Sequence, residues 1–224
     1  KAIRRIRGKD ISVIPQDALH ALNPVHRIGR QVGEPLSIHT DRSGSAIRAM
    51  VLKYLAKVKI DNPRLRARQY PHQFSGGMQQ RALTAMALST EPSLIIADEP
   101  TTALDVTIQA QILELMVDLS TEFGTAMIII THNLGVVARY AKRVIVMYAG
   151  KIIERGTAAD IYLNPKHPYT RGLLKSVPRL DQPKREKLEP IDGMPPDLIS
   201  LPAGCSFRAR CTYAVERCAT DRPE

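Results

Sequence analysis

Three short runs of apolar residues stand out along the chain and predict strands. Residues 11–14, 94–97 and 126–131 are each a nearly unbroken apolar stretch. The second run leads into two acids and a proline, and the third leads into a histidine. A short continuous run of this kind is typical of a strand that is buried on both faces of a parallel sheet. We therefore expect residues 94–97 and 126–131 to be buried strands, with residues 11–14 as a further strand.

Other segments repeat apolar residues every three or four positions, the spacing of an amphipathic helix. Residues 25–70 are helical in pattern, and the clearest stretch is 45–60, where Asn62-Pro63 should end the helix. Residues 82–89, 107–123 and 133–140 are further predicted helices, and Gly124 should end the helix at 107–123. Residues 143–148 and 151–154 predict a hairpin that turns at Ala149-Gly150. The apolar stripes of the two longest helices are Ile47, Met50, Val51, Tyr54, Leu55 and Val58, and Ile108, Ile112, Leu115, Met116 and Leu119.

Strands that alternate with helices indicate an α/β fold with a largely parallel sheet. The 224 residues are enough for one large domain or two small ones with a real core. No apolar run approaches the roughly 18 residues that a membrane span requires. Residues 1–10 are basic and lack the apolar centre of a signal peptide.

The net charge of +10 is unevenly distributed along the chain. Residues 1–70 carry +10, residues 71–138 carry −6 and residues 139–224 carry +6. A basic protein invites a nucleic-acid interpretation, but aromatic residues make up only 4% and Trp is absent. No zinc-finger or RRM pattern is present either. Solvated helix faces close to an anionic membrane surface explain the charge better.

Two adjacent acids, Asp98 and Glu99, follow the predicted strand at 94–97. Open α/β sheets bind their ligands at the carboxyl ends of strands. Neighbouring strand positions point in opposite directions, so one acid can hold Mg²⁺ through its oxygens while the other orients or deprotonates a water. The alternative is a strand end with two solvated acids that have no function.

A second candidate site is the glycine-led start of a helix. Ser75-Gly76-Gly77 precedes the alanine- and leucine-rich run, and the unpaired N–H groups of a helix start attract phosphate. Ser and Gly are also ordinary helix caps. Gln16 follows the first strand in a predicted loop, residues 16–24, where a neutral amide is suited to contact Mg²⁺. His132 follows the third strand, where an imidazole can donate a hydrogen bond to a phosphate.

Five motifs together resemble the ATPases of ABC transporters, and they occur in that family's order. They are Gln16 as the Q-loop glutamine, residues 74–81 (FSGGMQQR) as the signature motif, residues 94–99 (LIIADE) as the Walker B strand, Ala103-Leu104-Asp105 as the D-loop and His132 as the switch histidine. The resemblance implies that Glu99, His132 and Gln16 are catalytic. It also implies that Ser75, Gly76, Gly77, Gln79, Asp98 and Asp105 bind the nucleotide, and that Asp98 and Gln16 bind Mg²⁺.

The phosphate loop of that family, G-x-x-x-x-G-K-[ST], does not occur in these residues. The only Gly-Lys pairs, Gly8-Lys9 and Gly150-Lys151, lack both the following Ser or Thr and the preceding Gly. We therefore expect a partial P-loop NTPase core that lacks its N-terminal part. We expect this chain to be inactive by itself.

The last third of the chain resembles the C-terminal extension of oligopeptide, dipeptide and nickel importer ATPases. The resemblance rests on His167-Pro168-Tyr169-Thr170 and Pro202-Ala203-Gly204-Cys205, with a charged, proline-rich run at 181–196 between them. Some members of that group are thought to hold a 4Fe–4S cluster, which needs four thiolates. This chain has three, Cys205, Cys211 and Cys218. They are candidate cluster ligands, and the alternative is partly buried structural thiols.

The resemblance implies an ATP- and Mg²⁺-dependent subunit that drives peptide uptake from the cytoplasmic face of the inner membrane. Its partners would be a second ATPase subunit, membrane permease subunits and, indirectly, an extracytoplasmic solute-binding protein, with no nucleic acid. Residues 1–158 would form the partial ATPase domain, with a helical subdomain at about 18–89, and residues 159–224 the extension. The alternatives are a soluble ABC ATPase that acts on nucleic acid or ribosomes, and a non-hydrolysing interaction subunit.

Overall fold

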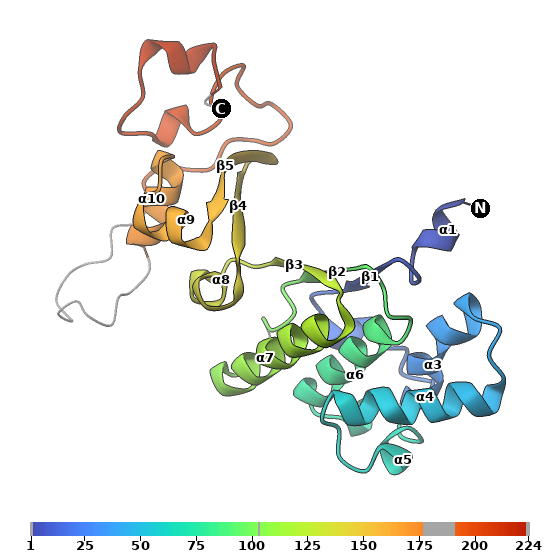
Figure 1. Ribbon diagram of the computed structural model, residues 1–224. Helices are drawn as coiled ribbons and strands as arrows, with labels where there is room; N and C mark the ends of the chain where they lie inside the picture. The colour runs from blue at the N-terminus through green and yellow to red at the C-terminus, as the bar shows by residue number, and fades with distance from the viewer. Residues whose placement is uncertain (1, 103, 177–190, 223–224) are drawn as a thin grey trace. The chain divides into compact units, whose positions relative to one another are not determined.

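The computed structural model describes residues 2–102, 104–176 and 191–222. They form two compact units, residues 1–132 and 133–224 (Figure 1). The predicted domain boundary at residue 158 lies inside the second unit, at the start of α9 (Ala158–Leu163). The proline-rich run at 181–196 lies outside the described residues up to residue 190.

The first unit is built on a three-stranded parallel sheet in the order β1-β2-β3. Its strands are β1 (Ile11–Ile14), β2 (Leu94–Asp98) and β3 (Ala126–Ile130). The register pairs Ile14 with Ala97, and Asp98 with Ile130. All three strands were predicted from the apolar runs, and their carboxyl ends meet at one edge of the sheet.

The helices of this unit follow the predicted pattern with three differences. They are α1 (Ala2–Ile6), α2 (Ala18–Ala21), α3 (Ile28–His39), α4 (Gly44–Lys57), α5 (Pro63–Arg66), α6 (Gly76–Leu88) and α7 (Val106–Phe123). The predicted loop at 16–24 contains the short helix α2, because Asp17 accepts a hydrogen bond from the backbone N–H of His20. The helix α4 ends at Lys57, and Pro63 starts α5 instead of only ending a helix. The helix α6 begins at Gly76, so the glycines lie in its first turn.

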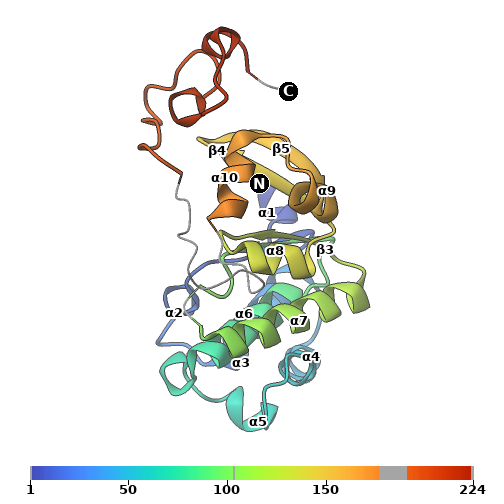
Figure 2. The same cartoon turned by 90° about the vertical axis from the view of Figure 1, so that its left-hand side faces the viewer.

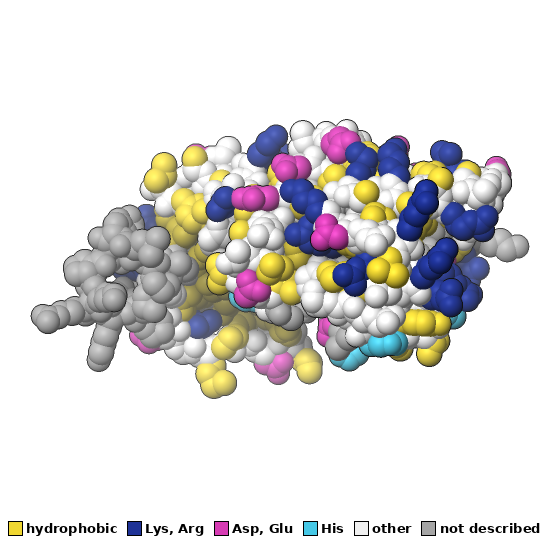
Figure 3. Space-filling model, turned by 90° about the horizontal axis from the view of Figure 1, so that it is seen from below, with side chains coloured by type: hydrophobic (Ala, Val, Ile, Leu, Met, Phe, Trp, Pro, Cys, Tyr) yellow, Lys and Arg dark blue, Asp and Glu magenta, His cyan; other side chains and the backbone are white. Residues whose placement is uncertain are grey.

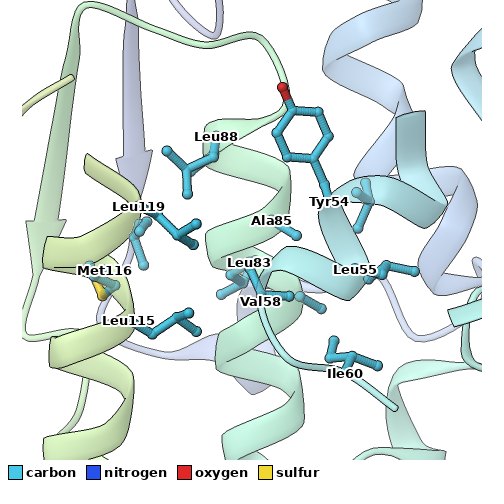
Figure 4. Packing of buried hydrophobic residues seen from close by; sticks show 14 of the residues in the cluster. Tyr54, Leu55, Val58, Ile60, Leu83, Ala85, Leu88, Leu115, Met116 and Leu119 are labelled. Atoms are coloured by element: carbon cyan, nitrogen blue, oxygen red, sulfur yellow. The ribbon is translucent and has the colours of Figure 1, made fainter. Parts of the chain in front are cut away.

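The core of this unit lies between one face of the sheet and the helices. Figure 4 shows side chains of α4, α6 and α7 packed against one another, and Tyr54, Leu55, Leu83 and Ile112 are each at most 1% exposed. In Figures 1 and 2, α6 and α7 lie along the same side of the sheet. Gly124 ends α7 in the left-handed conformation, as predicted.

The prediction that the strands are buried on both faces is wrong for the described residues. Side chains on one face are covered, including Ile95 at 2% and Ala97 at 0% exposure. On the other face Val13, Ile128 and Ile130 are 57%, 50% and 48% exposed. A continuous apolar run does not reveal which face the helices cover, and here the helices packed on the sheet lie on one side.

The second unit contains an antiparallel hairpin with short helices. The hairpin is β4 (Arg143–Tyr148) and β5 (Lys151–Thr157), joined through Ala149 and Gly150, both at positive φ as a two-residue turn requires. Its α-helices are α8 (Leu134–Tyr140), α9 and α10 (Pro168–Lys175), and residues 208–210 and 216–219 form 3₁₀ turns. Among the described residues no helix has the length and apolar character needed to cross a membrane.

An aromatic cluster joins residues 191–210 to the rest of this unit. Phe207 is 3% exposed, and its ring lies 5.3 Å from Tyr148 and 5.4 Å from Tyr169, both close to edge-on. Arg210 donates to the Tyr148 hydroxyl at 3.3 Å and to the carbonyl oxygen of Ile191 at 2.8 Å. These contacts attach residues 191–210 to the hairpin and α10.

Candidate functional site at the strand ends

Three predicted site residues meet where the parallel strands end. Gln16 follows β1 by two positions, Glu99 follows β2 directly, and His132 follows β3 by two positions. The amide Nε2 of Gln16 donates to Oε2 of Glu99 at 2.8 Å. Nδ1 of His132 lies 2.8 Å from Oε1 of the same carboxylate. The sheet therefore brings residues 16, 99 and 132 together around one carboxylate.

A fourth residue, Thr102, also contacts Glu99. Its hydroxyl donates to Oε2 at 2.9 Å, so one carboxylate oxygen accepts from Gln16 and Thr102 while the other faces His132. Our sequence reasoning did not assign Thr102 a role. The available signal was a threonine three positions after a strand-end acid, the spacing at which a hydroxyl reaches back within a turn.

The backbone holds Glu99 in an unusual conformation. Its φ is +42°, a left-handed value that is uncommon for a residue with a side chain. Its N–H donates to the carbonyl oxygen of Ile130 at 2.9 Å, and its own carbonyl oxygen accepts from the N–H of Thr102 at 3.3 Å. The chain thus leaves the sheet in a tight turn right after β2, with the Glu99 side chain in reach of the neighbouring strand ends. Strain of this kind is concentrated at functional sites.

These contacts favour the ionised carboxylate. The hydrogen bond from His132 is the largest cause that lowers the pKa of Glu99 below its usual range, followed by the hydrogen bond from Thr102, while desolvation acts in the opposite direction. The Glu99 side chain is 22% exposed and that of His132 is 72% exposed. The site therefore presents an anionic acceptor, lined with donors, at a surface that solvent and ligands reach.

Asp98 lies beside this cluster with its carboxylate exposed. Among the described residues its carboxylate makes no hydrogen bond or ion pair, in contrast to that of Glu99. An exposed carboxylate and the remaining amide oxygen of Gln16 are hard donors, and Mg²⁺ is commonly held by one or two carboxylates together with substrate phosphates and water. The described residues contain no group of three or more His, Cys, Asp or Glu that could hold a metal on their own. The donor set fits Mg²⁺ that arrives with a nucleotide.

The remaining nucleotide-binding candidates lie at the first turns of α6 and α7. Ser75 caps α6 and accepts from the N–H of Met78 at 3.4 Å, and Asp105 caps α7 and accepts from the N–H of Ile108 at 3.0 Å. An added Cβ at Gly76 would lie 3.4 Å from the Leu104 side chain, and one at Gly77 would lie 3.0 Å from the Ile108 side chain. The two helix starts are therefore in contact. Ala103, the first residue of the D-loop motif, lies outside the described residues.

Gln79 differs from its neighbours in the signature motif. Its side chain is 6% exposed, and its amide donates to the carbonyl oxygen of Pro71 at 2.9 Å. In this arrangement Gln79 supports the loop before α6, while Ser75 and Gly76 are exposed. A direct contact between Gln79 and a nucleotide stays a prediction.

The three cysteines lie in the second unit and do not form a ligand set. The N–H of Cys205 donates to the carbonyl oxygen of Cys218 at 3.0 Å, yet Cys205, Cys211 and Cys218 do not form a metal-binding group within the part of the chain that the structure describes. All three are free and partly buried. These three residues do not fit an iron–sulfur cluster, which needs four thiolates.

Comparison with known proteins agrees with the family resemblance of both parts of the chain. Residues 1–102 match the family model for "ABC transporter", and residues 153–218 match "Oligopeptide/dipeptide transporter, C-terminal region". The chain also resembles solved ATPase structures. The dimeric, post-hydrolysis structure of the ATP-binding cassette MJ0796 bound to ADP and Pi is 29% identical with a TM-score of 0.62, over 70% of this chain and 66% of that one.

Curated relatives are more similar in sequence. The dipeptide transport ATP-binding protein DppD of Bacillus subtilis is 57% identical over 97% of this chain and 65% of its own length. The oligopeptide transport ATP-binding protein OppD of Salmonella typhimurium is 48% identical over 100% of this chain and 66% of its own length. "Probable peptide ABC transporter ATP-binding protein y4tR" of Sinorhizobium fredii is 48% identical over 100% of this chain and 67% of its own length. The chain spans about two thirds of the length of these relatives. It belongs to the ATP-binding subunits of ABC transporters, in the group that carries the oligopeptide/dipeptide transporter C-terminal region.

Proposed function

We propose that the protein containing this chain hydrolyses ATP as a subunit of an importer for peptides. The observation that carries the proposal is the carboxylate of Glu99, surrounded by Gln16, Thr102 and His132 at the ends of three parallel strands. The names of the curated relatives, which include dipeptide and oligopeptide transport ATP-binding proteins, support the peptide class. Such a subunit would act at the cytoplasmic face of the inner membrane, together with permease subunits and, indirectly, an extracytoplasmic solute-binding protein.

Glu99 would orient the water that attacks the γ-phosphate. Because its pKa is lowered, the carboxylate is ionised at neutral pH and accepts a hydrogen bond from that water. A lowered pKa makes it a weak base. Phosphoryl transfer, however, proceeds through a loose transition state in which positioning and charge stabilisation matter more than early proton removal. Orientation of the water is therefore the larger part of its role.

His132 and Gln16 would divide the remaining tasks at the γ-phosphate. With Nδ1 directed at Glu99, the Nε2 atom of His132 is left to interact with the phosphate, and the ring is 72% exposed. Asp98 and the amide oxygen of Gln16 would hold Mg²⁺. When bound, the ion neutralises negative charge on the phosphates as the bond to the leaving group breaks.

The first turn of α6 would bind the ATP held by a second subunit. Ser75 and Gly76 are exposed at the start of a 13-residue helix, and N–H groups at such a start favour phosphate. The related cassette MJ0796 was solved as a dimer. Asp105, in the helix start that contacts α6, would lie at the same interface.

Residues 1–224 contain no phosphate loop. We therefore expect no turnover by this chain alone, and activity must be measured on the complete gene product.

The direct test uses the complete gene product and its Glu99→Gln variant. Loss of the carboxylate should lower kcat for ATP by about 10²–10⁴-fold, while Glu34→Gln, an exposed carboxylate on α3, should leave it unchanged. In cells that lack the gene, the wild type should restore uptake of labelled di- or oligopeptides and Glu99→Gln should not. Equal hydrolysis by the wild type and Glu99→Gln would refute the ATPase role. Peptide uptake that does not depend on the gene would refute the substrate class.

A further inference from the structure

The turn that follows β2 contains a hydroxyl that none of the roles above explains. Thr102 donates through its hydroxyl to Oε2 of Glu99 at 2.9 Å and lies 3.3 Å from the backbone carbonyl oxygen of Glu99. Its N–H donates to the same carbonyl oxygen at 3.3 Å. The side chain of Thr102 is thus bound to both the main chain and the side chain of Glu99.

Thr102 differs from the other two donors in where it is attached. Gln16 and His132 belong to segments 83 and 33 residues away in sequence, so their distances to Glu99 depend on the loops after β1 and β3. Thr102 is three residues away, in the same turn. The distance from its hydroxyl to Oε2 therefore depends on this one turn and not on the loops after β1 and β3.

The donors divide unequally between the two carboxylate oxygens. A carboxylate has about two acceptor sites on each oxygen. Gln16 and Thr102 together occupy both sites on Oε2, whereas His132 occupies one site on Oε1. Oε1 is the oxygen with a site left for a water molecule, on the side where His132 also lies.

We propose that Thr102 is a positioning residue that anchors Oε2 of Glu99 and so presents Oε1 to the attacking water. This inference rests on the proposed ATPase function for its consequence in catalysis, but the anchoring itself is a property of the chain. The backbone of Glu99 has a strained left-handed conformation. An unanchored side chain at such a position would adopt several rotamers, and most of them would not align the water with the phosphate. The hydroxyl removes that freedom within the turn.

The test compares Thr102→Val, which keeps the shape and removes the hydroxyl, with Thr102→Ser, which keeps the hydroxyl. In the 224-residue chain, NMR coupling constants measured at neutral pH report the rotamers of the Glu99 side chain. Loss of the hydroxyl should replace one rotamer by a mixture, and serine should restore the single rotamer, because the hydroxyl holds Oε2 at 2.9 Å. Thr121→Val is the matched control, since it removes a hydroxyl bonded to a backbone carbonyl elsewhere. If Thr102→Val does not fold, Thr102→Ala supplies the same comparison.

The second readout is the kcat of the complete gene product. Thr102→Val should lower kcat about tenfold with KM for ATP little changed, and Thr102→Ser should restore kcat. A single, unchanged Glu99 rotamer in the valine or alanine variant would overturn the inference, whatever the activity. A mixture of Glu99 rotamers in a protein that hydrolyses ATP independently of Glu99 would instead confirm the anchoring and refute the proposed function.

Discussion

Nδ1 of His132 lies 2.8 Å from Oε1 of Glu99, although 33 residues separate the two in the chain. The contact exists because β2 and β3 are neighbouring parallel strands in register, with Asp98 opposite Ile130. Each residue follows its strand closely, so the sheet fixes their separation. A glutamate that accepts from a histidine, a glutamine and a threonine is held in one orientation, which is the condition for directing a water at a phosphate.

The first prediction concerns the acid side of the stability curve. The pKa of Glu99 should lie below the usual range of a glutamate, and His132→Ala should raise it, because His132 is the largest cause of the lowering. A carboxyl whose folded-state pKa is depressed stabilises the fold above its unfolded pKa, and this stabilisation is lost as the pH falls through the folded value. Unfolding midpoints measured between neutral pH and pH 3 should show a smaller acid-induced drop in His132→Ala. An identical drop in both proteins would contradict the coupling.

The second prediction concerns the close approach of α3 to α5. The N–H of Gly29 donates to the carbonyl oxygen of Ala67 at 2.9 Å, and a Cβ at Gly29 would lie 2.8 Å from that oxygen. Because the obstacle is backbone, Gly29→Ala should destabilise α3 by about 1–3 kcal/mol. Hydrogen exchange of the α3 and α5 amides measures this directly.

The matched control is Gly44→Ala at the start of α4. Its Cβ would meet only the Arg48 side chain, at 3.9 Å, so we expect a change within about 1 kcal/mol. Equal exchange rates in the two alanine variants would mean that the contact between Gly29 and Ala67 is not tight.

The third prediction concerns the aromatic cluster of the second unit. Phe207→Ala removes a ring that is 3% exposed and packed against Tyr148, Tyr169 and His167. A loss of about 3–5 kcal/mol is typical for a buried Phe, so residues 191–222 should detach and trypsin should cleave after Arg208 and Arg210 much faster. Tyr213→Ala, at a side chain 65% exposed, should not change the cleavage rate. Unchanged cleavage in Phe207→Ala would show that other contacts hold this segment.

Much of the first unit follows from the sequence, because its strands are continuous apolar runs and its helices have clear stripes. The assembly of Gln16, Glu99 and His132 also follows, since the carboxyl ends of parallel strands meet at one edge. The positive φ of Glu99 does not follow, because it depends on a turn that the neighbouring strand holds in place. The spacing of Thr102 was an available signal, but it does not tell which carboxylate oxygen the hydroxyl reaches. No pattern within one strand tells which face of the sheet the helices cover.

The charge distribution can be read directly from the sequence, but the kind of partner that the charge indicates cannot. Lys and Arg side chains gather toward one end of the face in Figure 3, and residues 1–70 carry a net +10. We weighed nucleic acid as a partner against solvated helix faces close to an anionic membrane surface, and the solvated faces explained the charge better. Curated relatives of the chain include dipeptide and oligopeptide transport ATP-binding proteins, and residues 153–218 match the oligopeptide/dipeptide transporter C-terminal region. Periodicity also does not predict ring contacts between residues far apart in the chain, such as Tyr148 and Phe207, which are 59 positions apart.

The most direct test of the role of Glu99 is a single-turnover measurement on the complete gene product. Glu99→Gln is mixed with γ-labelled ATP and Mg²⁺, and bound nucleotide and released phosphate are counted in the same sample. We predict that the variant binds ATP as the wild type does and releases phosphate at least about 100-fold more slowly. Phosphate release at the wild-type rate from the ATP-bound variant would show that Glu99 does not direct the attacking water.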